Sequence, residues 1–266
     1  MFRILSRPIA LVPRIPRARG LVTLNNDLIQ NLKSHKIIPD VLDSFNPLGL
    51  ITISHDNKDV TMGNTLTPAE ARERPLVHTA LNISDDPSLV GSSYTLVLTD
   101  PDSTVGAAAE PSKSVEIHNT NNNNAGMTTD YLHYIVSGLR LSSDHADFSQ
   151  LDLDKGDEIL PYLGPILPNG SGKHRFVYIL FKEPPGSTIK SINNIIYTTS
   201  SNHANSSSRP LEEGGENNNE KALTVLDEPV RVAFGSGLRV KQWAMKHSLT
   251  PVAVNFYYAQ GQPTQE

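Results

Sequence analysis

Short apolar runs, each joined at one end to a polar cluster, constrain this chain most strongly. The run at 94–98 leads into Thr-Asp-Pro-Asp at 99–102, and the run at 176–181 follows Gly-Ser-Gly-Lys-His-Arg at 170–175. Runs of about four to eight residues that are bounded by Pro, Gly and Asn are typical of β-strands and too short for core helices. The chain is therefore expected to fold mainly as antiparallel β-structure.

Segments with this strand pattern recur along the chain. Two helices are also expected, a short one capped at residues 25–27 and a C-terminal one over 238–247 in which Trp243 packs into the core. Strands separated by turn residues, with few helices between them, favour an antiparallel sheet over a parallel one. The predicted strands are 49–53, 76–83, 94–99, 132–139, 176–181 and 252–258.

The composition fits a single ordinary domain. Of the 266 residues, 38% are hydrophobic and 19% are charged, which is typical of one soluble domain. Two segments, near 118–126 and 200–220, are rich in Asn, Ser, Gly and Glu and lack the apolar residues needed to offset the entropy lost on ordering. We interpret them as solvated insertions in one domain that spans 27–262.

Residues 1–26 differ in composition from the rest of the chain. They contain five arginines and neither a lysine nor an acid, whereas the remainder carries a formal charge of −10, which gives −5 overall. An Arg-rich, acid-free start is typical of a mitochondrial presequence, although Pro8, Pro13 and Pro16 would break the helix that such signals form. The segment is interpreted either as a mitochondrial presequence or as a disordered tail on a cytoplasmic protein.

Charge and composition exclude several classes of protein. An acidic body without basic tracts lacks the Lys and Arg side chains that neutralise phosphates, so nucleic acid is not an expected partner. No apolar run approaches the roughly 20 residues of a transmembrane helix. The chain has no cysteine, so disulfides, thiolate catalysis and Cys-based zinc sites are excluded.

The polar clusters occur in a recognisable order: Thr-Asp-Pro-Asp at 99–102, Tyr-Leu-His-Tyr at 131–134, and a Gly-rich loop that leads into His-Arg at 174–175. This order resembles the phosphatidylethanolamine-binding protein family. Met-Gly-Asn-Thr-Leu-Thr at 62–67 and Val-Asn-Phe-Tyr-Tyr-Ala at 254–259 are similar to its fungal carboxypeptidase-inhibitor branch. The resemblance implies an antiparallel β-sandwich with a few peripheral helices. It also implies a small anion pocket near one end of the sheet, lined by Asp100, Asp102, Tyr131, His133, Pro168 and His174.

The residues themselves are suited to an anion site. A phosphate or carboxylate needs hydrogen-bond donors, which the imidazoles of His133 and His174 supply. Asp100 and Asp102 cannot donate while they are ionised, so we expect them to orient and charge the imidazoles or to accept from an ammonium group. Arg175 is interpreted as a structural residue that pairs with an acid.

Several positions depart from the family pattern. Ser103 and Thr104 follow the Asp-Pro-Asp sequence where the family has Ala-Pro, and Phe176 stands where the family has Tyr, so one hydroxyl donor is absent. Ile166 and Leu167 replace the smaller residues or prolines that are usual there. We expect a pocket that keeps the scaffold of the family but differs in specificity.

These observations favour a non-enzymatic binding and regulatory protein that needs neither a cofactor nor a metal. The expected ligand is a small anion or a phospholipid headgroup, and the resemblance adds a serine carboxypeptidase or a kinase as protein partner. Two alternatives stay open: a structural subunit of the mitochondrial ribosome with the same fold, and a hydrolase that uses a metal or acid–base chemistry. No Gly-x-Ser-x-Gly or His-Glu-x-x-His motif supports the hydrolase.

Overall fold

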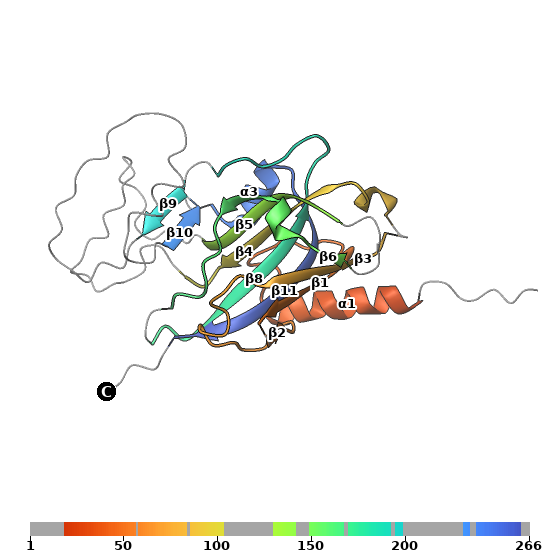
Figure 1. The fold of residues 1–266 in the computed structure, drawn as a ribbon. Coiled ribbons are helices and arrows are strands. Elements are labelled where there is room, and N and C mark those ends of the chain that lie inside the picture. Colours follow the sequence, from red (N-terminus) through yellow and green to blue (C-terminus); the bar gives the residue numbers. More distant parts are fainter. Residues whose placement is uncertain are drawn as a thin grey trace, which may run out of the picture.

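The computed structural model describes residues 19–56, 58–83, 86–103, 130–141, 149–167, 170–192, 195–198, 231–234 and 238–261. Two α-helices, two 3₁₀ turns and eleven strands lie within these ranges (Figure 1). In chain order they are α1 (Arg19–Ser34), β1 (Gly49–His55), β2 (Lys58–Val60), β3 (Leu76–Leu81), η1 (Pro87–Leu89), β4 (Ser93–Asp100), β5 (Tyr131–Arg140), β6 (Ser149–Gln150), η2 (Leu153–Lys155), β7 (Asp157–Leu160), β8 (Lys173–Lys182), β9 (Ile195–Thr198), β10 (Arg231–Phe234), α3 (Val240–Lys246) and β11 (Thr250–Gln260).

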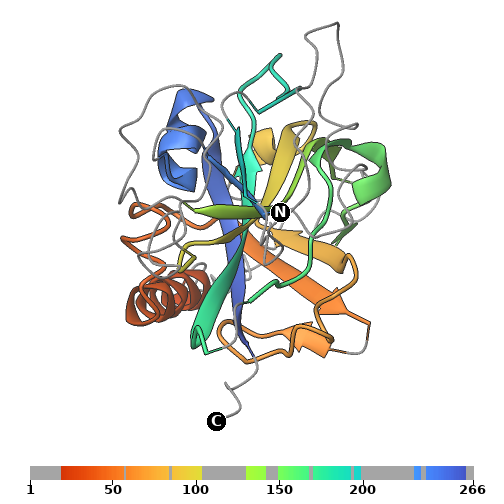
Figure 2. The same cartoon turned by 90° about the vertical axis from the view of Figure 1, so that its left-hand side faces the viewer.

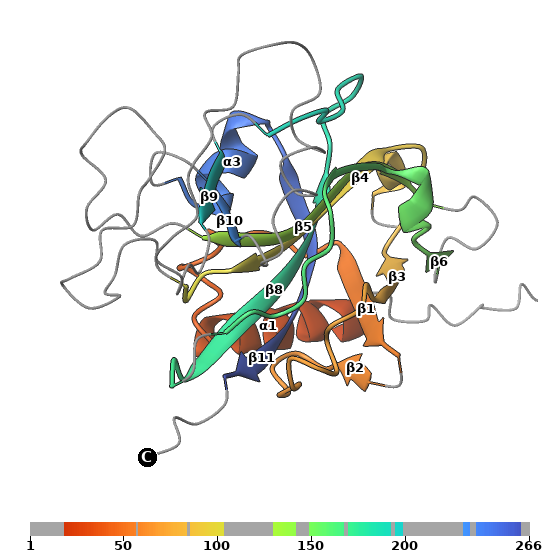
Figure 3. The ribbon, with the colours of Figure 1, turned by 60° about the vertical axis from the view of Figure 1, so that its left-hand side comes forward.

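The described strands form two antiparallel sheets. The small sheet has the order β2-β1-β3-β6, and the large sheet has the order β11-β8-β4-β5-β10-β9, with β7 paired to β5. Strands β8 and β11 run side by side over almost their full length, so the end of β11 lies beside the start of β8 (Figure 3). The expected antiparallel β-sandwich is confirmed.

The long apolar run of β8 is explained by burial on both faces of the large sheet. Because side chains alternate along a strand, Phe176, Tyr178 and Leu180 face the small sheet, and the residues between them face the other way. On that second face α1 and α3 cover the sheet, with Trp243 of α3 only 2% exposed. Figure 2 shows this layering, with α1 in red and α3 in blue on one side of the long strands and the orange strands of the small sheet on the other.

Asn255 of β11 joins the two sheets. Its side-chain amide donates to the carbonyls of Ile51 at 2.9 Å and Val60 at 3.0 Å, in two strands of the small sheet. Its side-chain oxygen accepts from the backbone N–H groups of Met62 at 3.1 Å and Phe256 at 2.8 Å. A buried amide with all of these bonds made stabilises the sandwich, because its polar atoms are not left unpaired.

The six predicted strands and the C-terminal helix are confirmed, with small shifts at their ends. The predicted start of the first helix was wrong: α1 begins at Arg19, and residues 25–27 lie inside it. Residues 17–38 contain no proline, so no proline prevents a helix from beginning before Asn25. Asn25 donates to the carbonyl of Pro47 at 3.2 Å and does not cap the helix.

Helix α1 therefore continues across the predicted boundary between the N-terminal segment, 1–26, and the domain, 27–262. The insertions predicted near 118–126 and 200–220 lie outside the described residues. Within the described part of the chain, no helix is both long and apolar enough to cross a membrane.

Candidate ligand-binding site

Three neighbouring strands of the large sheet bring predicted site residues to one edge. Strand β4 lies between β8 and β5 and runs antiparallel to both, so the end of β4 lies beside their first residues. Asp100 is the last residue of β4, His174 is the second of β8 and His133 is the third of β5. We call these three side chains and that of Ser103 the Asp100–His174 cluster. Each of its four residues is at most 6% exposed; they are Asp100, Ser103, His133 and His174.

Asp100 is the central acceptor of this cluster. Its Oδ2 accepts from Nδ1 of His174 at 2.8 Å and from the hydroxyl of Ser103 at 2.5 Å. Its Oδ1 accepts from the backbone N–H groups of Asp102 at 2.8 Å and Ser103 at 3.2 Å, as in an Asx turn. Because an ionised carboxylate only accepts, Nδ1 of His174 carries a hydrogen. The turn therefore fixes the orientation of both the carboxylate and the imidazole.

Neighbouring charges oppose the effect of burial on Asp100. Burial raises the pKa of its carboxyl group, but the hydrogen bond and charge of His174, the charge of His133 and the hydrogen bond from Ser103 together bring that pKa below its ordinary value. A buried negative charge stabilises positive charge on adjacent imidazoles. The cluster is thus able to present charged imidazoles to an anion.

His133 is oriented by a loop carbonyl. Its Nδ1 donates to the carbonyl of Leu163 at 2.9 Å, and the N–H of Leu163 donates back to the carbonyl of His133 at 2.7 Å. Its ring meets Phe176 edge to face with the centroids 4.9 Å apart, and Phe176 stacks on Tyr257 at 5.2 Å. These contacts fix the ring plane of His133 from two sides.

Asp102 takes part in a different set of contacts. Its carboxylate accepts from Arg175 through Nε at 2.8 Å, Nη2 at 2.5 Å and the backbone N–H at 2.8 Å. The interpretation of Arg175 as a structural partner of an acid is therefore confirmed. Successive side chains of β8 point to opposite faces, so Arg175 lies on the other side of the strand from His174. The structure places Asp102 with Arg175 and not with the imidazoles.

Tyr131, expected as an aromatic wall, opens β5 directly beside Asp100. The two residues are register partners, and the Tyr131 carbonyl accepts from the hydroxyl of Thr99 at 2.8 Å. Tyr131 is 5% exposed and forms a small apolar cluster with Ala233 of β10. Pro168 lies outside the described residues. The proposed ligand contacts of both residues stay predictions.

Sequence reasoning missed the role of Ser103. It noted this serine only as a departure from the family pattern, yet its hydroxyl donates to Asp100 and lies 3.2 Å from Nδ1 of His174. An Asp that is followed two or three residues later by a small hydroxylated residue is a common signature of an Asx turn. The Asp100 and Ser103 pair could therefore have been identified from the sequence as an Asx turn.

A second buried carboxylate, also missed from the sequence, lies next to the cluster. Asp130 directly precedes β5, is completely buried, and accepts from Nε of Arg239 at 2.8 Å and from the N–H of Val240 at 2.8 Å. Burial raises the pKa of Asp130 and outweighs the opposing effects of Val240 and Arg239, and the charge of Asp100 raises it further. Asp130 thereby ties the start of α3 to the edge of the sheet.

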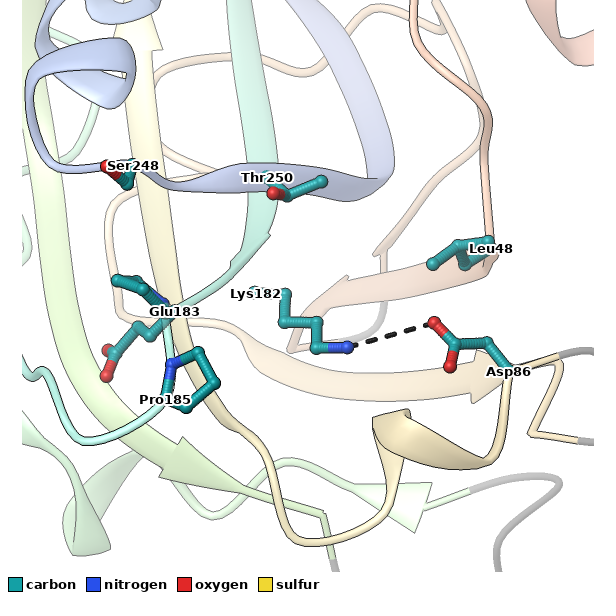
Figure 4. A pocket seen from close by; sticks show the side chains of 8 residues that line it. Leu48, Asp86, Lys182, Glu183, Pro185, Ser248 and Thr250 are labelled. Carbon is teal, nitrogen blue, oxygen red and sulfur yellow. Dashed lines mark ion pairs between the residues drawn. The ribbon is translucent and has the colours of Figure 1, made fainter.

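A cavity of about 310 Å³ lies at the opposite end of β8. Leu48, Ser248 and Thr250 line it around the ion pair between Lys182 and Asp86, whose Nζ and Oδ2 atoms are 3.7 Å apart (Figure 4). The ammonium group also donates to the hydroxyl of Ser88 at 2.5 Å. In this cavity one ammonium group faces the carboxylate of Asp86, whereas in the Asp100–His174 cluster two imidazoles lie around one carboxylate, so the cluster is the better candidate for an anion site.

Within the described ranges, no three His, Cys, Asp or Glu side chains converge in a way that could hold a metal ion. The site as described consists of two imidazoles, the carboxylate of Asp100 and the hydroxyl of Ser103. Imidazoles donate to or accept from a ligand according to their charge, and carboxylates fix which of these they do.

The fold and the order of these motifs define a class of protein. The family described as Phosphatidylethanolamine-binding protein matches residues 56–257, and the chain belongs to that family. It is 27% identical over 254 residues to the carboxypeptidase Y inhibitor of Saccharomyces cerevisiae. This alignment covers 87% of this chain and 94% of the relative. It is also 29% identical over 157 residues to the protein TERMINAL FLOWER 1 of Arabidopsis thaliana, and this alignment covers 59% of this chain and 70% of that relative.

Solved structures share the fold. The crystal structure of carboxypeptidase Y inhibitor complexed with the cognate proteinase aligns with a TM-score of 0.60 at 24% identity, covering 92% of this chain and all of that one. The phosphatidylethanolamine-binding protein from Plasmodium vivax aligns with a TM-score of 0.50 at 22% identity, covering 88% of this chain and 97% of that one. At these identities the likeness establishes the architecture alone.

Proposed function

We propose that this chain is a non-enzymatic binding and regulatory protein whose Asp100–His174 cluster binds a phosphoryl-type anion. The observation that carries the proposal is the hydrogen bond from His174 to the buried carboxylate of Asp100. The nearby imidazole of His133 is held by the carbonyl of Leu163. Oriented imidazoles at the edge of a rigid sheet are suited to donate to the oxygens of a phosphoryl group.

A binding role agrees better with the chain than hydrolysis does. The family is named for binding phosphatidylethanolamine, and the yeast relative is named as an inhibitor. The sequence contains neither the Gly-x-Ser-x-Gly motif of serine hydrolases nor the His-Glu-x-x-His motif of zinc proteases. Both groups of observations support a protein that recognises a ligand without transforming it.

Sulfate is the probe that tests the anion site, because its charge does not change between about pH 5.5 and pH 8 while imidazoles lose their protons in that range. We expect the purified chain to bind sulfate in calorimetry, with an affinity that falls as the pH rises. His174→Gln is expected to weaken binding about tenfold, since a charge-assisted hydrogen bond is lost. The matched variant His78→Gln, in the small sheet, is expected to bind as the native chain does.

Two further ligands distinguish the sources of the anion. Stronger binding of phosphoethanolamine than of inorganic phosphate would identify a lipid headgroup as the preferred ligand, and equal binding would identify a free phosphoryl anion. If sulfate, phosphate and phosphoethanolamine all fail to bind at millimolar concentration, the proposed anion site is wrong.

We also propose that a serine carboxypeptidase is a protein partner of this chain. The support is the alignment with the yeast carboxypeptidase Y inhibitor, which extends over 94% of that relative. The full chain is the appropriate material, because removal of residues 1–26 would cut through α1. We expect inhibition of peptide hydrolysis at micromolar protein. An unchanged hydrolysis rate at that concentration would remove the protease partner and leave anion binding in place.

A further inference from the structure

The C-terminal end of helix α1 presents backbone carbonyls to the large sheet. The helix ends in a Schellman motif: the N–H of Ile37 donates to the carbonyl of Leu32 at 2.8 Å, and the N–H of Lys36 donates to that of Lys33 at 3.0 Å. Lys36 has the left-handed conformation, with φ 55°, that this motif requires. The carbonyls of His35 and Lys36 lie at this end of the helix, where the negative end of its dipole is.

Arg175 binds this end of the helix. Its Nη1 donates to the carbonyl of Lys36 at 2.7 Å, to that of His35 at 3.3 Å and to Oδ2 of Asp40 at 3.2 Å. The side chain of Arg175 is only 11% exposed, so these bonds are largely shielded from water. A guanidinium group offers several donors in a fixed plane, which allows it to hold the helix end and a second group at once.

The second group is Asp102, in the turn that builds the Asp100–His174 cluster. Nε and Nη2 of Arg175 bind its carboxylate, and the N–H of Asp102 in turn donates to Asp100 at 2.8 Å. Asp100 holds His174, the residue next to Arg175 in β8. A closed chain of contacts therefore runs from the end of α1 through Arg175 and Asp102 to the imidazole of His174.

We propose that Arg175 is a positioning residue that couples anion binding at the Asp100–His174 cluster to the docking of helix α1. The proposal rests on the proposed anion site. When α1 is docked, its carbonyls and Asp40 hold the guanidinium where it both neutralises and fixes Asp102. When α1 is displaced, these acceptors are lost, Asp102 is less well fixed, and the turn that orients His174 loosens.

Coupling of this kind is reciprocal. An anion that binds the cluster strengthens the docking of α1, and a protein partner that pulls the N-terminal segment away weakens anion binding by the same factor. The chain would in this way signal occupancy of its ligand site to a partner that engages its N-terminal segment.

Two variants of the full chain test the coupling from opposite sides. Arg175→Lys keeps the charge but loses the planar fork, so we expect sulfate affinity to fall about fivefold. Leu32 belongs to α1, and its side chain is completely buried against the large sheet. Leu32→Ala therefore loosens the packing of α1, and it leaves the charge of the chain unchanged. We expect a similar fall in sulfate affinity. The control is Leu249→Ala, a truncation in the same apolar core. Leu249 directly precedes β11, at the end of that strand away from His174, and the variant is expected to leave sulfate affinity unchanged.

Amide hydrogen exchange provides a second readout that a purely structural role would not change. Saturating sulfate is expected to slow exchange at the N–H of Ile37, which closes the helix end, and to leave the N–H of Leu249 unaffected. Thermal unfolding of all variants verifies that each is folded at the measuring temperature.

The outcomes separate the coupling from the proposed function. If the native chain binds sulfate but both variants bind it equally well, and exchange at Ile37 is unchanged, the coupling is overturned and the anion site stands. If the native chain binds no anion, the proposed function and the coupling both fail. A loss of affinity in both variants together with slower exchange at Ile37 supports the coupling.

Discussion

Replacing Arg239 by Met is expected to lower the free energy of unfolding by about 3 to 5 kcal/mol at pH 7. The reason is that Arg239 is the charged partner of Asp130, which is completely buried. Among the described residues, the substitution leaves that carboxylate with the N–H of Val240 as its donor. Chemical denaturation of the variant and the native chain, monitored by circular dichroism, measures the difference.

The pH dependence of this loss identifies its cause. The pKa of Asp130 is already raised in the folded state, and removal of Arg239 raises it further. An acid whose pKa is raised on folding does not lower the free energy of unfolding below its unfolded pKa of about 3.9. It lowers that free energy progressively as the pH rises from there through its folded pKa. The stability deficit of Arg239→Met should therefore shrink towards pH 4 and grow towards pH 7.

Two control variants make the prediction specific. Asp130→Asn in the Arg239→Met background removes the charge, so the difference in stability should no longer depend on pH in this range. Lys241→Met removes an ion pair from helix α3, which Arg239 directly precedes, but Asp43, the partner of Lys241, is 67% exposed. We expect Lys241→Met to change the stability by less than about 1 kcal/mol. A deficit for Arg239→Met that is equally small would show that the buried pair is not important for stability.

The sequence allowed the strands of this fold to be predicted because burial leaves a direct mark on local composition. The run at 176–181 is apolar at every position except the hydroxyl of Tyr178, and both faces of β8 are buried. Asp100, His133 and His174 stand at strand ends, where a polar residue that interrupts an apolar run is visible without knowledge of the tertiary structure. Strand alternation and turn chemistry are local, and local rules were sufficient for them.

The remaining features depend on contacts between distant parts of the chain. Asp130 and Arg239 are 109 residues apart, and nothing in either neighbourhood indicates the other. The same is true of Arg175 and the carbonyls at the end of α1. The start of α1 was misplaced because Asn and Asp residues resemble a cap, whereas a tertiary contact to Pro47 uses the amide of Asn25.

Asp100→Asn is expected to weaken sulfate binding by at least about tenfold, because it removes the charge that stabilises protonated imidazoles. The substituted amide can still accept from the backbone N–H groups of Asp102 and Ser103, so the turn is retained. Its NH₂ group cannot accept from Nδ1 of His174, which favours a neutral imidazole with its hydrogen on the other nitrogen. Calorimetry with sulfate near pH 6 measures the effect. A matched control is Asp152→Asn, which changes an exposed Asx turn that binds the N–H of Asp154 and the side chain of Lys155, and it should leave sulfate affinity unchanged.

The same variant also tests the electrostatics of the cluster in the absence of ligand. The pKa of Asp100 is lowered in the folded state, so its ionised form contributes stability above its unfolded pKa of about 3.9, and this contribution is lost as the pH falls through the folded pKa. The native chain should therefore exceed Asp100→Asn in stability near pH 7, and the difference should decrease below about pH 4. If the difference is independent of pH, the carboxylate of Asp100 acts only as a hydrogen-bond acceptor. An anion would then have to be held by donors whose charge does not depend on Asp100, and sulfate affinity would survive the substitution.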